Sequence, residues 1–233
     1  MNARLQRDNE LTAELVLELM SRLVSALDNR GVDATIYIVG GAAIALDYDS
    51  RRLTVDVDAF FEPRDVVLEE SRKLADEFGI SDDWLNDKAK MGQVNADDDG
   101  VPQVMSSGRV KVTTASPHHL IAMKLAAERD RDVNDIATIL EETGLDPTEA
   151  IDIAHDLYGE GAMYLQDREE SDIVMNEALA IMARRRKQRE GALPLNGRLT
   201  IPGSGALCGF PVPSNNNAPC IRAVHSGNDH RSR

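Results

Sequence analysis

Hydrophobic positions in the first 50 residues change from a helical to an extended spacing. Residues 10–28 carry leucine at every fourth position, which is typical of the buried face of an amphipathic helix, and Gly31 ends this helix. Residues 34–39 (ATIYIV) are β-branched or aromatic and predict a buried strand. Gly40 and Gly41 follow at once and precede AAIAL, so we expect a turn that opens a short helix.

An alternating pattern over LTVDVDAFF predicts a second strand, because every second residue of a strand projects to the same face. One expected face carries Leu53, Val55, Val57 and Ala59. The other face carries Thr54, Asp56, Asp58 and Phe60, and therefore two acids. Residues 63–78 then predict a helix, and residues 82–89 predict a short turn-helix in which Trp84 and Leu85 are packing residues.

The following part of the chain alternates once more and then becomes helical. Residues 109–114 (RVKVTT) predict a third strand. Ser116 is expected to cap the next helix, LIAMKLAAERD, with Pro117 as its first residue. Three further helices are predicted at about 132–142, 146–158 and 170–189. Residues 95–100 (NADDDG) predict an exposed loop, and the Gly-, Pro- and Asn-rich segment after Glu190 predicts disorder.

These elements predict an α/β (α+β) protein: a short mixed β-sheet flanked by helices, with a helical C-terminal part. The expected parts are an N-terminal helix (1–33), a central α/β domain (34–143), a helical part (144–190) and a tail (191–233).

Net charge narrows the range of partners. The chain carries −14; from Arg184 onward nine basic residues and two acids give +7, so residues 1–183 carry −21. Such an acidic body repels nucleic acid and argues against duplex DNA as a partner. No run approaches the roughly 18 apolar residues that a membrane helix needs, and the first 14 residues lack a signal-type apolar stretch. We therefore expect a cytoplasmic protein with no membrane association.

Asp56 and Asp58 are the first candidates for chemistry. On a strand they would stand about 7 Å apart on one face. Two like charges on a half-buried face need neutralisation, either by a divalent cation or by nearby cations such as Arg51 and Arg52. Magnesium binds carboxylate and triphosphate oxygens. Both explanations remain open on these residues alone.

The double glycine supplies a second candidate feature. Gly40 and Gly41 lie where a strand gives way to a helix, so backbone N–H groups there can approach a phosphate without an intervening Cβ. A double glycine alone is more often a plain turn. The two features together are more specific than either one.

The combination, IYIVGGAAIALDYDSRRLTVDVDAFF, resembles the signature of the minimal nucleotidyltransferases of the DNA polymerase β superfamily. Further along, ASPHHLIAMKLAAERDRDVNDIATIL resembles the downstream Lys and Asp motifs of the AbiEii/MenT-type toxin nucleotidyltransferases, and DDWLNDKAK is similar to a segment of bacterial relatives in that group. The resemblance spans about residues 34–143.

The resemblance implies a role for each matching residue. Asp56 and Asp58 would bind metal, Gly40, Gly41 and Thr54 would contact the nucleotide, Lys124 would grip the triphosphate, and Asp132 would close the site, with Asp135 as the second choice. On one continuous helix Lys124 and Asp135 share a face, whereas a helix break near Asp130 favours Asp132.

Two departures from the family pattern concern the same site. Many members have Ser where this chain has Gly41, so a phosphate contact there would rely on the backbone. The segment RVKVTT offers Lys111 and Thr113 where polymerase-type enzymes have a third strand carboxylate.

Other residues have ordinary alternatives. Without the upstream motif, Lys124 is a solvated helix charge with Glu128 at i+4. His118 and His119 lack metal-ligand spacing, so capping or surface exposure is the expected role.

By resemblance, the function is Mg2+-dependent transfer of NMP from an NTP to an acceptor hydroxyl, with tRNA as one such acceptor. The protein would be the toxin of a bacterial toxin–antitoxin system with a cognate antitoxin protein as partner. A catalytically inactive nucleotidyltransferase fold that serves as a binding or antitoxin-like partner is the alternative. A metal-dependent phosphohydrolase that uses the same carboxylates is a third.

Overall fold

The computed structural model describes residues 10–88, 103–127, 130–158 and 167–192. The chain divides at Gln188 into two units, and the description below concerns the first. The predicted loop at 95–100 and the predicted disorder of the tail lie outside the described residues, apart from the last residues of the final helix.

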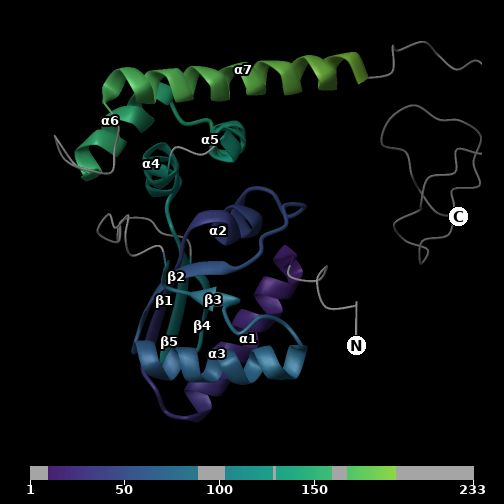
Figure 1. The fold of residues 1–233 in the computed structure, drawn as a ribbon, viewed down its shortest axis with the longest axis vertical. Coiled ribbons are helices and arrows are strands. Elements are labelled where there is room, and N and C mark those ends of the chain that lie inside the picture. Colours follow the sequence, from purple (N-terminus) through teal and green to yellow (C-terminus); the bar gives the residue numbers. More distant parts are fainter. Residues whose placement is uncertain (1–9, 89–102, 128–129, 159–166, 193–233) are drawn as a thin grey trace, which may run out of the picture. The chain divides into compact units, whose positions relative to one another are not determined.

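Five strands form one mixed sheet in the order β3-β2-β1-β5-β4 (Figure 1). The central strand β1 (Ala34–Ile38) pairs antiparallel with β2 (Val57–Glu62) and parallel with β5 (Val110–Thr114). At the edges, β3 (Leu85–Asn86) is parallel to β2, and β4 (Gln103–Ser106) is antiparallel to β5. The mixed sheet expected from the sequence is confirmed.

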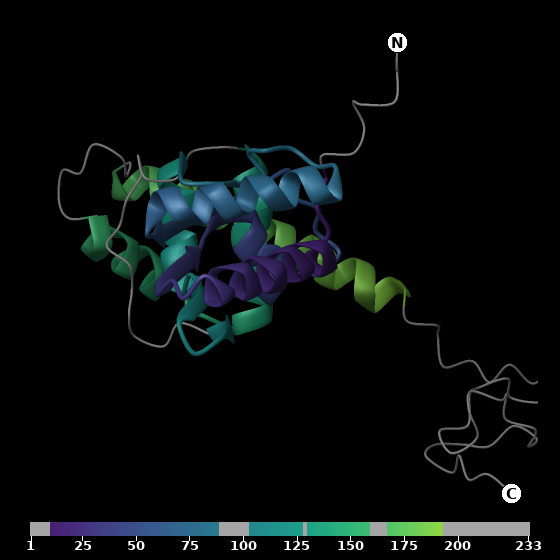
Figure 2. The ribbon, with the colours of Figure 1, turned by 90° about the horizontal axis from the view of Figure 1, so that it is seen from below.

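Two long helices lie side by side against the sheet (Figure 2). They are α1 (Ala13–Asn29) and α3 (Arg64–Phe78). The leucine spacing of α1 places Leu19 and Leu23 in the core with no exposed surface, as the pattern predicts. Thr12 caps this helix, since its side chain accepts a hydrogen bond from the backbone N–H of Leu15.

The remaining helices follow the predicted order. Helix α2 (Gly40–Asp47) contacts β2 and α4 (Pro117–Ala127), and α4 packs against α5 (Asp130–Thr143) and α6 (Pro147–Tyr158). The last helix, α7 (Arg168–Ala192), is longer than predicted. Buried residues of the sheet and of all seven helices belong to one hydrophobic cluster. No helix among the described residues is both long enough and apolar enough to cross a membrane.

The second strand begins at Val57, later than the alternation predicts. Leu53 and Val55, which were expected on this strand, lie ahead of it and are 47% and 60% exposed, so the predicted start of the strand is wrong. The reason is local: the backbone of Thr54 pairs with Leu11 in an isolated antiparallel bridge, and Thr54 Oγ1 donates to the carbonyl of Asp56 at 2.9 Å. The chain therefore bends before β2, and Asp56 lies just ahead of the strand that carries Asp58.

The turn-helix predicted at 82–89 is also wrong in part. A turn there leads into the short strand β3. The packing role of Trp84 is confirmed, because its ring is buried and its Nε1 donates to the carbonyl of Ser71 at 2.9 Å. Neither β3 nor β4 was predicted, since strands of two and four residues are too short to show an alternation.

Candidate active site at the glycine turn

Gly40 opens α2 in a conformation that favours glycine. Its φ is +63°, in the left-handed region where a Cβ is strained. The preceding residue, Val39, is extended, and its N–H donates to the carbonyl of Asp58 at 2.9 Å. A Cβ built on Gly40 would lie 3.5 Å from Asp58 Oδ2. The turn therefore places the Asp58 carboxylate beside the first residue of the helix.

Gly41 brings two more side chains to the same turn. A Cβ at this position would lie 3.1 Å from Thr54 Oγ1 and 3.3 Å from Arg52 Nη2. These distances are tighter than ordinary contacts, so a side chain at position 41 would crowd both groups. The predicted contacts Gly40, Gly41 and Thr54 are thus brought together around one turn.

The Asp56 carboxylate accepts a hydrogen bond from Asn86, the last residue of β3. The Asn86 side chain, which is 6% exposed, donates from Nδ2 to Asp56 Oδ2 at 3.0 Å. Its Oδ1 accepts from the backbone N–H of Lys88 at 3.0 Å, which fixes the orientation of the amide. Sequence reasoning missed Asn86. The only signal was a lone amide directly after the buried pair Trp84 and Leu85.

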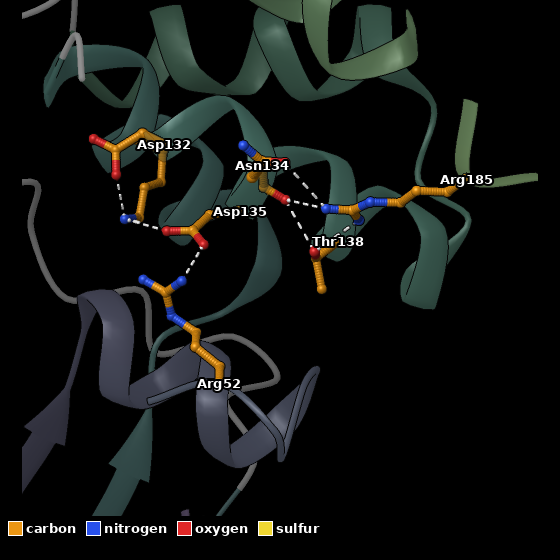
Figure 3. Close-up of polar contacts among 7 residues, drawn as sticks. Arg52, Asp132, Asn134, Asp135, Thr138 and Arg185 are labelled. Carbon is orange, nitrogen blue, oxygen red and sulfur yellow. Dashed lines mark hydrogen bonds and ion pairs between the residues drawn. The ribbon is translucent and has the colours of Figure 1, made fainter. Parts of the chain in front are cut away.

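Lys124 is the centre of a buried ion-pair network. Its Nζ lies 2.5 Å from Asp132 Oδ1 and 2.7 Å from Asp135 Oδ2, and both acids are almost fully buried. Lys124 lies on α4, and both acids lie on α5, which packs against α4 and presents their carboxylates to the lysine (Figure 3). The sequence left open whether Asp132 or Asp135 would lie near Lys124, and the structure places both there. The alternative of a solvated Lys124 is wrong.

Arg52 extends this network to the glycine turn. Its Nη1 forms an ion pair with Asp135 Oδ1 at 2.6 Å, so the two oxygens of Asp135 face two different cations (Figure 3). Arg51 pairs instead with Asp49 at 3.2 Å. The two arginines that could have neutralised Asp56 and Asp58 thus form their ion pairs with other acids.

Asp56 and Asp58 are the carboxylates that the sequence predicts as metal ligands. Within the described part of the chain no group of three or more His, Cys, Asp or Glu side chains could hold a metal ion. Magnesium does not require one, because it is often bound by one or two carboxylates together with substrate phosphates. The carboxylates of Asp56 and Asp58 therefore have the chemistry to hold such an ion.

His119 and Ser116 lie at the start of α4. His119 is fully buried, and its Nδ1 lies 2.7 Å from the hydroxyl of Tyr37, so the expectation of surface exposure is wrong for it. The predicted cap is confirmed: Ser116 Oγ accepts from the backbone N–H of His119 at 3.2 Å, and α4 begins at Pro117.

One comparison with known proteins gives a match. The model of a family described as "Nucleotidyltransferase of unknown function (DUF6036)" matches residues 16–175, which is more than half of the chain and includes every residue of the site. No curated protein and no solved structure matches the chain.

Proposed function

We propose that this chain, which belongs to the DUF6036 family of nucleotidyltransferases of unknown function, transfers a nucleoside monophosphate from an NTP to an acceptor hydroxyl in the presence of Mg2+. One observation supports this most directly. The glycine turn, the Asp56–Asp58 pair and the Lys124 network are linked by Thr54 and by the Arg52–Asp135 ion pair into one continuous set of contacts.

Each part of the site has a role in the proposed reaction. The acceptor oxygen attacks the α-phosphorus, the bond from that phosphorus to the bridging oxygen breaks, and pyrophosphate leaves. The N–H groups at the start of α2 and the Lys124 ammonium group would bind triphosphate oxygens. Asp56 and Asp58 would hold Mg2+, which when bound neutralises charge on the phosphates. Positioning and charge neutralisation account for most of the catalysis in such a scheme.

Asp132 has a feature that suits this chemistry. One of its oxygens accepts from Lys124, while Oδ2 is buried and has no hydrogen-bond partner among the described residues. A buried carboxylate oxygen without a partner is uncommon outside functional sites. This observation supports the proposal that Asp132 belongs to the active site.

The biological setting is proposed from the sequence motifs. Their resemblance to AbiEii/MenT-type enzymes supports a toxin that modifies tRNA and is neutralised by a cognate antitoxin. Because residues 1–183 carry −21, a basic surface on an antitoxin would be attracted to this body. For the same reason, an RNA acceptor would have to meet the basic residues that begin at Arg184.

The test is direct transfer from labelled nucleotide. The full chain is incubated with Mg2+ and each of the four α-labelled NTPs in separate samples of total RNA and total protein. We expect one fraction to become labelled and pyrophosphate to be released in proportion. Release of free phosphate without labelling would indicate a phosphohydrolase, and nucleotide binding without release would indicate an inactive binding protein. Either result would contradict the proposal.

A further inference from the structure

Arg52 presents two different edges of its guanidinium group to the candidate site. Nη1 is paired with Asp135 on α5. Nε and Nη2 lie beside the glycine turn, since a Cβ built on Gly41 would be 3.7 Å and 3.3 Å from these two nitrogens. Figure 3 shows the side chain reaching from the segment before β2 toward Asp135. The side chain is 27% exposed, so it is largely removed from solvent.

The edge beside Gly41 has an unsatisfied donor. Nε of Arg52 is buried and has no hydrogen-bond partner in the described part of the chain. Buried donors are nearly always paired, because an unpaired one has lost its water without compensation. The N–H groups on Nε and Nη2 form a planar fork that matches two oxygens of a phosphate group. This edge therefore has the chemistry of a phosphate site.

The surroundings of that edge favour an anion with several charges. The first N–H groups of α2 have no partner within the helix, and Gly40 and Gly41 leave them uncovered by a Cβ. Asp135 holds Arg52 on one oxygen and Lys124 on the other, so two cations are fixed around one carboxylate. A triphosphate offers enough negative charge for both cations.

We propose that Arg52 is a triphosphate-binding residue and that Asp135 is the positioning residue that orients Arg52 and Lys124. The proposal depends on the proposed function for the identity of the ligand as an NTP. It goes beyond the roles implied by the resemblance above, which gave none to Arg52. It also changes the role of Asp135, from a nucleotide contact to the counter-ion of two cations.

The experiment measures binding of inorganic tripolyphosphate without metal, and of each NTP with Mg2+, by calorimetry on the folded full chain. R52K keeps the charge and its attraction to Asp135 but lacks the fork. We expect it to weaken tripolyphosphate binding by about tenfold, as the loss of a charged hydrogen-bond pair implies. R51K is the matched control. Arg51 is the adjacent residue, is 91% exposed and pairs with Asp49. The affinity of the R51K variant for tripolyphosphate should therefore stay within about twofold of the parent value.

Two further variants separate binding from structure. D135N should weaken tripolyphosphate binding although Arg52 is still present, because the arginine is no longer held by a charge. If R52K does not fold, R52Q/D135N replaces the ion pair with a pair of neutral amides, and its tripolyphosphate affinity is compared with that of D135N to isolate the effect of position 52. A variant at position 52 that melts at lower temperature but binds tripolyphosphate as tightly as the parent would show a structural role alone, and would overturn the proposal. Parental affinity in D135N would overturn the positioning role.

Failure of this inference can be told apart from failure of the proposed function. If the parent transfers NMP and R52K does so with an unchanged KM for NTP, the inference is wrong and the function stands. If tripolyphosphate binds through Arg52 but no NMP is transferred to RNA or protein, the anion site stands and the proposed function is wrong. If tripolyphosphate does not bind the parent at all, the inference is overturned.

Discussion

Gly40 and Asp58 are in close contact: a Cβ on the glycine would lie 3.5 Å from Oδ2 of the aspartate. The same glycine has a φ of +63°. The backbone conformation favours glycine, and a side chain here would also stand beside the Asp58 carboxylate. A substitution at Gly40 would therefore have two separate effects, one on stability and one on the site.

Gly40→Ala should reduce both stability and transfer. The left-handed conformation costs an L-residue about 1–2 kcal/mol. The added methyl group would lie at van der Waals distance from Asp58 Oδ2 and occupy space beside the first N–H groups of α2. Gly31→Ala is the matched control, because Gly31 has a φ of +69° but nothing within 4 Å of a built Cβ. We expect the two variants to lose the same amount of melting temperature. Only the Gly40 variant should lose transfer activity. Equal transfer in the two variants would mean that the glycine turn is not part of the site.

Asp56→Asn and Asp58→Asn should each abolish most transfer and leave the fold intact. Loss of a charged group at a phosphate-transfer site costs about 100-fold or more in rate. The asparagine at position 56 can still accept the hydrogen bond from Asn86, so its melting temperature should change little. Asn86→Ala should lower transfer less, because it removes only the orienting contact. Transfer at parental rates in either aspartate variant would contradict the assignment.

Lys124→Met should be strongly destabilising. It leaves Asp132 without its cation, and Asp135 with Arg52 alone, in a buried environment. Breaking one partner out of a buried ion pair costs about 3–5 kcal/mol, which a denaturant titration would measure. Lys73→Met removes an exposed lysine that also pairs with two acids, Glu69 and Glu70, and should cost much less. A similar cost for both variants would show that burial of the Lys124 network contributes little.

Stability should fall in acid partly through Glu70. Burial alone would raise the pKa of this carboxyl, but hydrogen bonds from Lys73 and Arg30 lower it below its usual value of 4.5. A pKa lowered on folding stabilises the protein above about pH 4.5, and this contribution is lost as the pH falls through the folded-state value. Glu70→Gln should therefore melt at lower temperature than the parent at pH 6, with the difference shrinking toward pH 3. Glu77→Gln, at a side chain 59% exposed, should follow the parent curve.

Arg185→Ala should loosen α7 from α5. The guanidinium group of Arg185 donates to Thr138 Oγ1 at 3.0 Å and to the backbone carbonyl and Oδ1 of Asn134 (Figure 3). It also donates to Glu141 Oε2 at 3.2 Å. Hydrogen exchange in the second half of α7 should become faster, with a loss of about 1 kcal/mol in stability. Arg184→Ala changes the exposed neighbour and should leave exchange unaltered. Unchanged exchange in the Arg185 variant would show that apolar contacts hold this helix.

The long periodic elements could be predicted from the sequence. The leucines of α1, the cap at Ser116 and the strand that ends at Thr114 repeat a local pattern, and local patterns follow from backbone geometry. The short strands β3 and β4 could not be predicted, since they exist because a neighbouring strand pairs with them. Leu53 was misplaced for a related reason, because the bridge between Leu11 and Thr54 overrides the alternation.

The candidate site, like the fold, could be predicted only in part from the sequence. The resemblance named the residues, and the structure brings Lys124, Asp132 and Asp135 together in one network. Helical spacing alone favoured only one of the two acids, because it does not predict how α5 packs against α4. Asn86 and the contact of Arg52 with Asp135 join segments far apart in sequence, and no pattern in one chain encodes such pairs.

The bridge between Leu11 and Thr54 has a practical consequence for handling the protein. Leu11, two residues before the first helix, is hydrogen-bonded through its backbone to Thr54 at 2.6 Å and 3.0 Å. A purification tag or a protease cut just before Leu11 therefore acts on the segment beside the glycine turn. Loss of activity after such a change should be traced to this strand pair before it is attributed to misfolding.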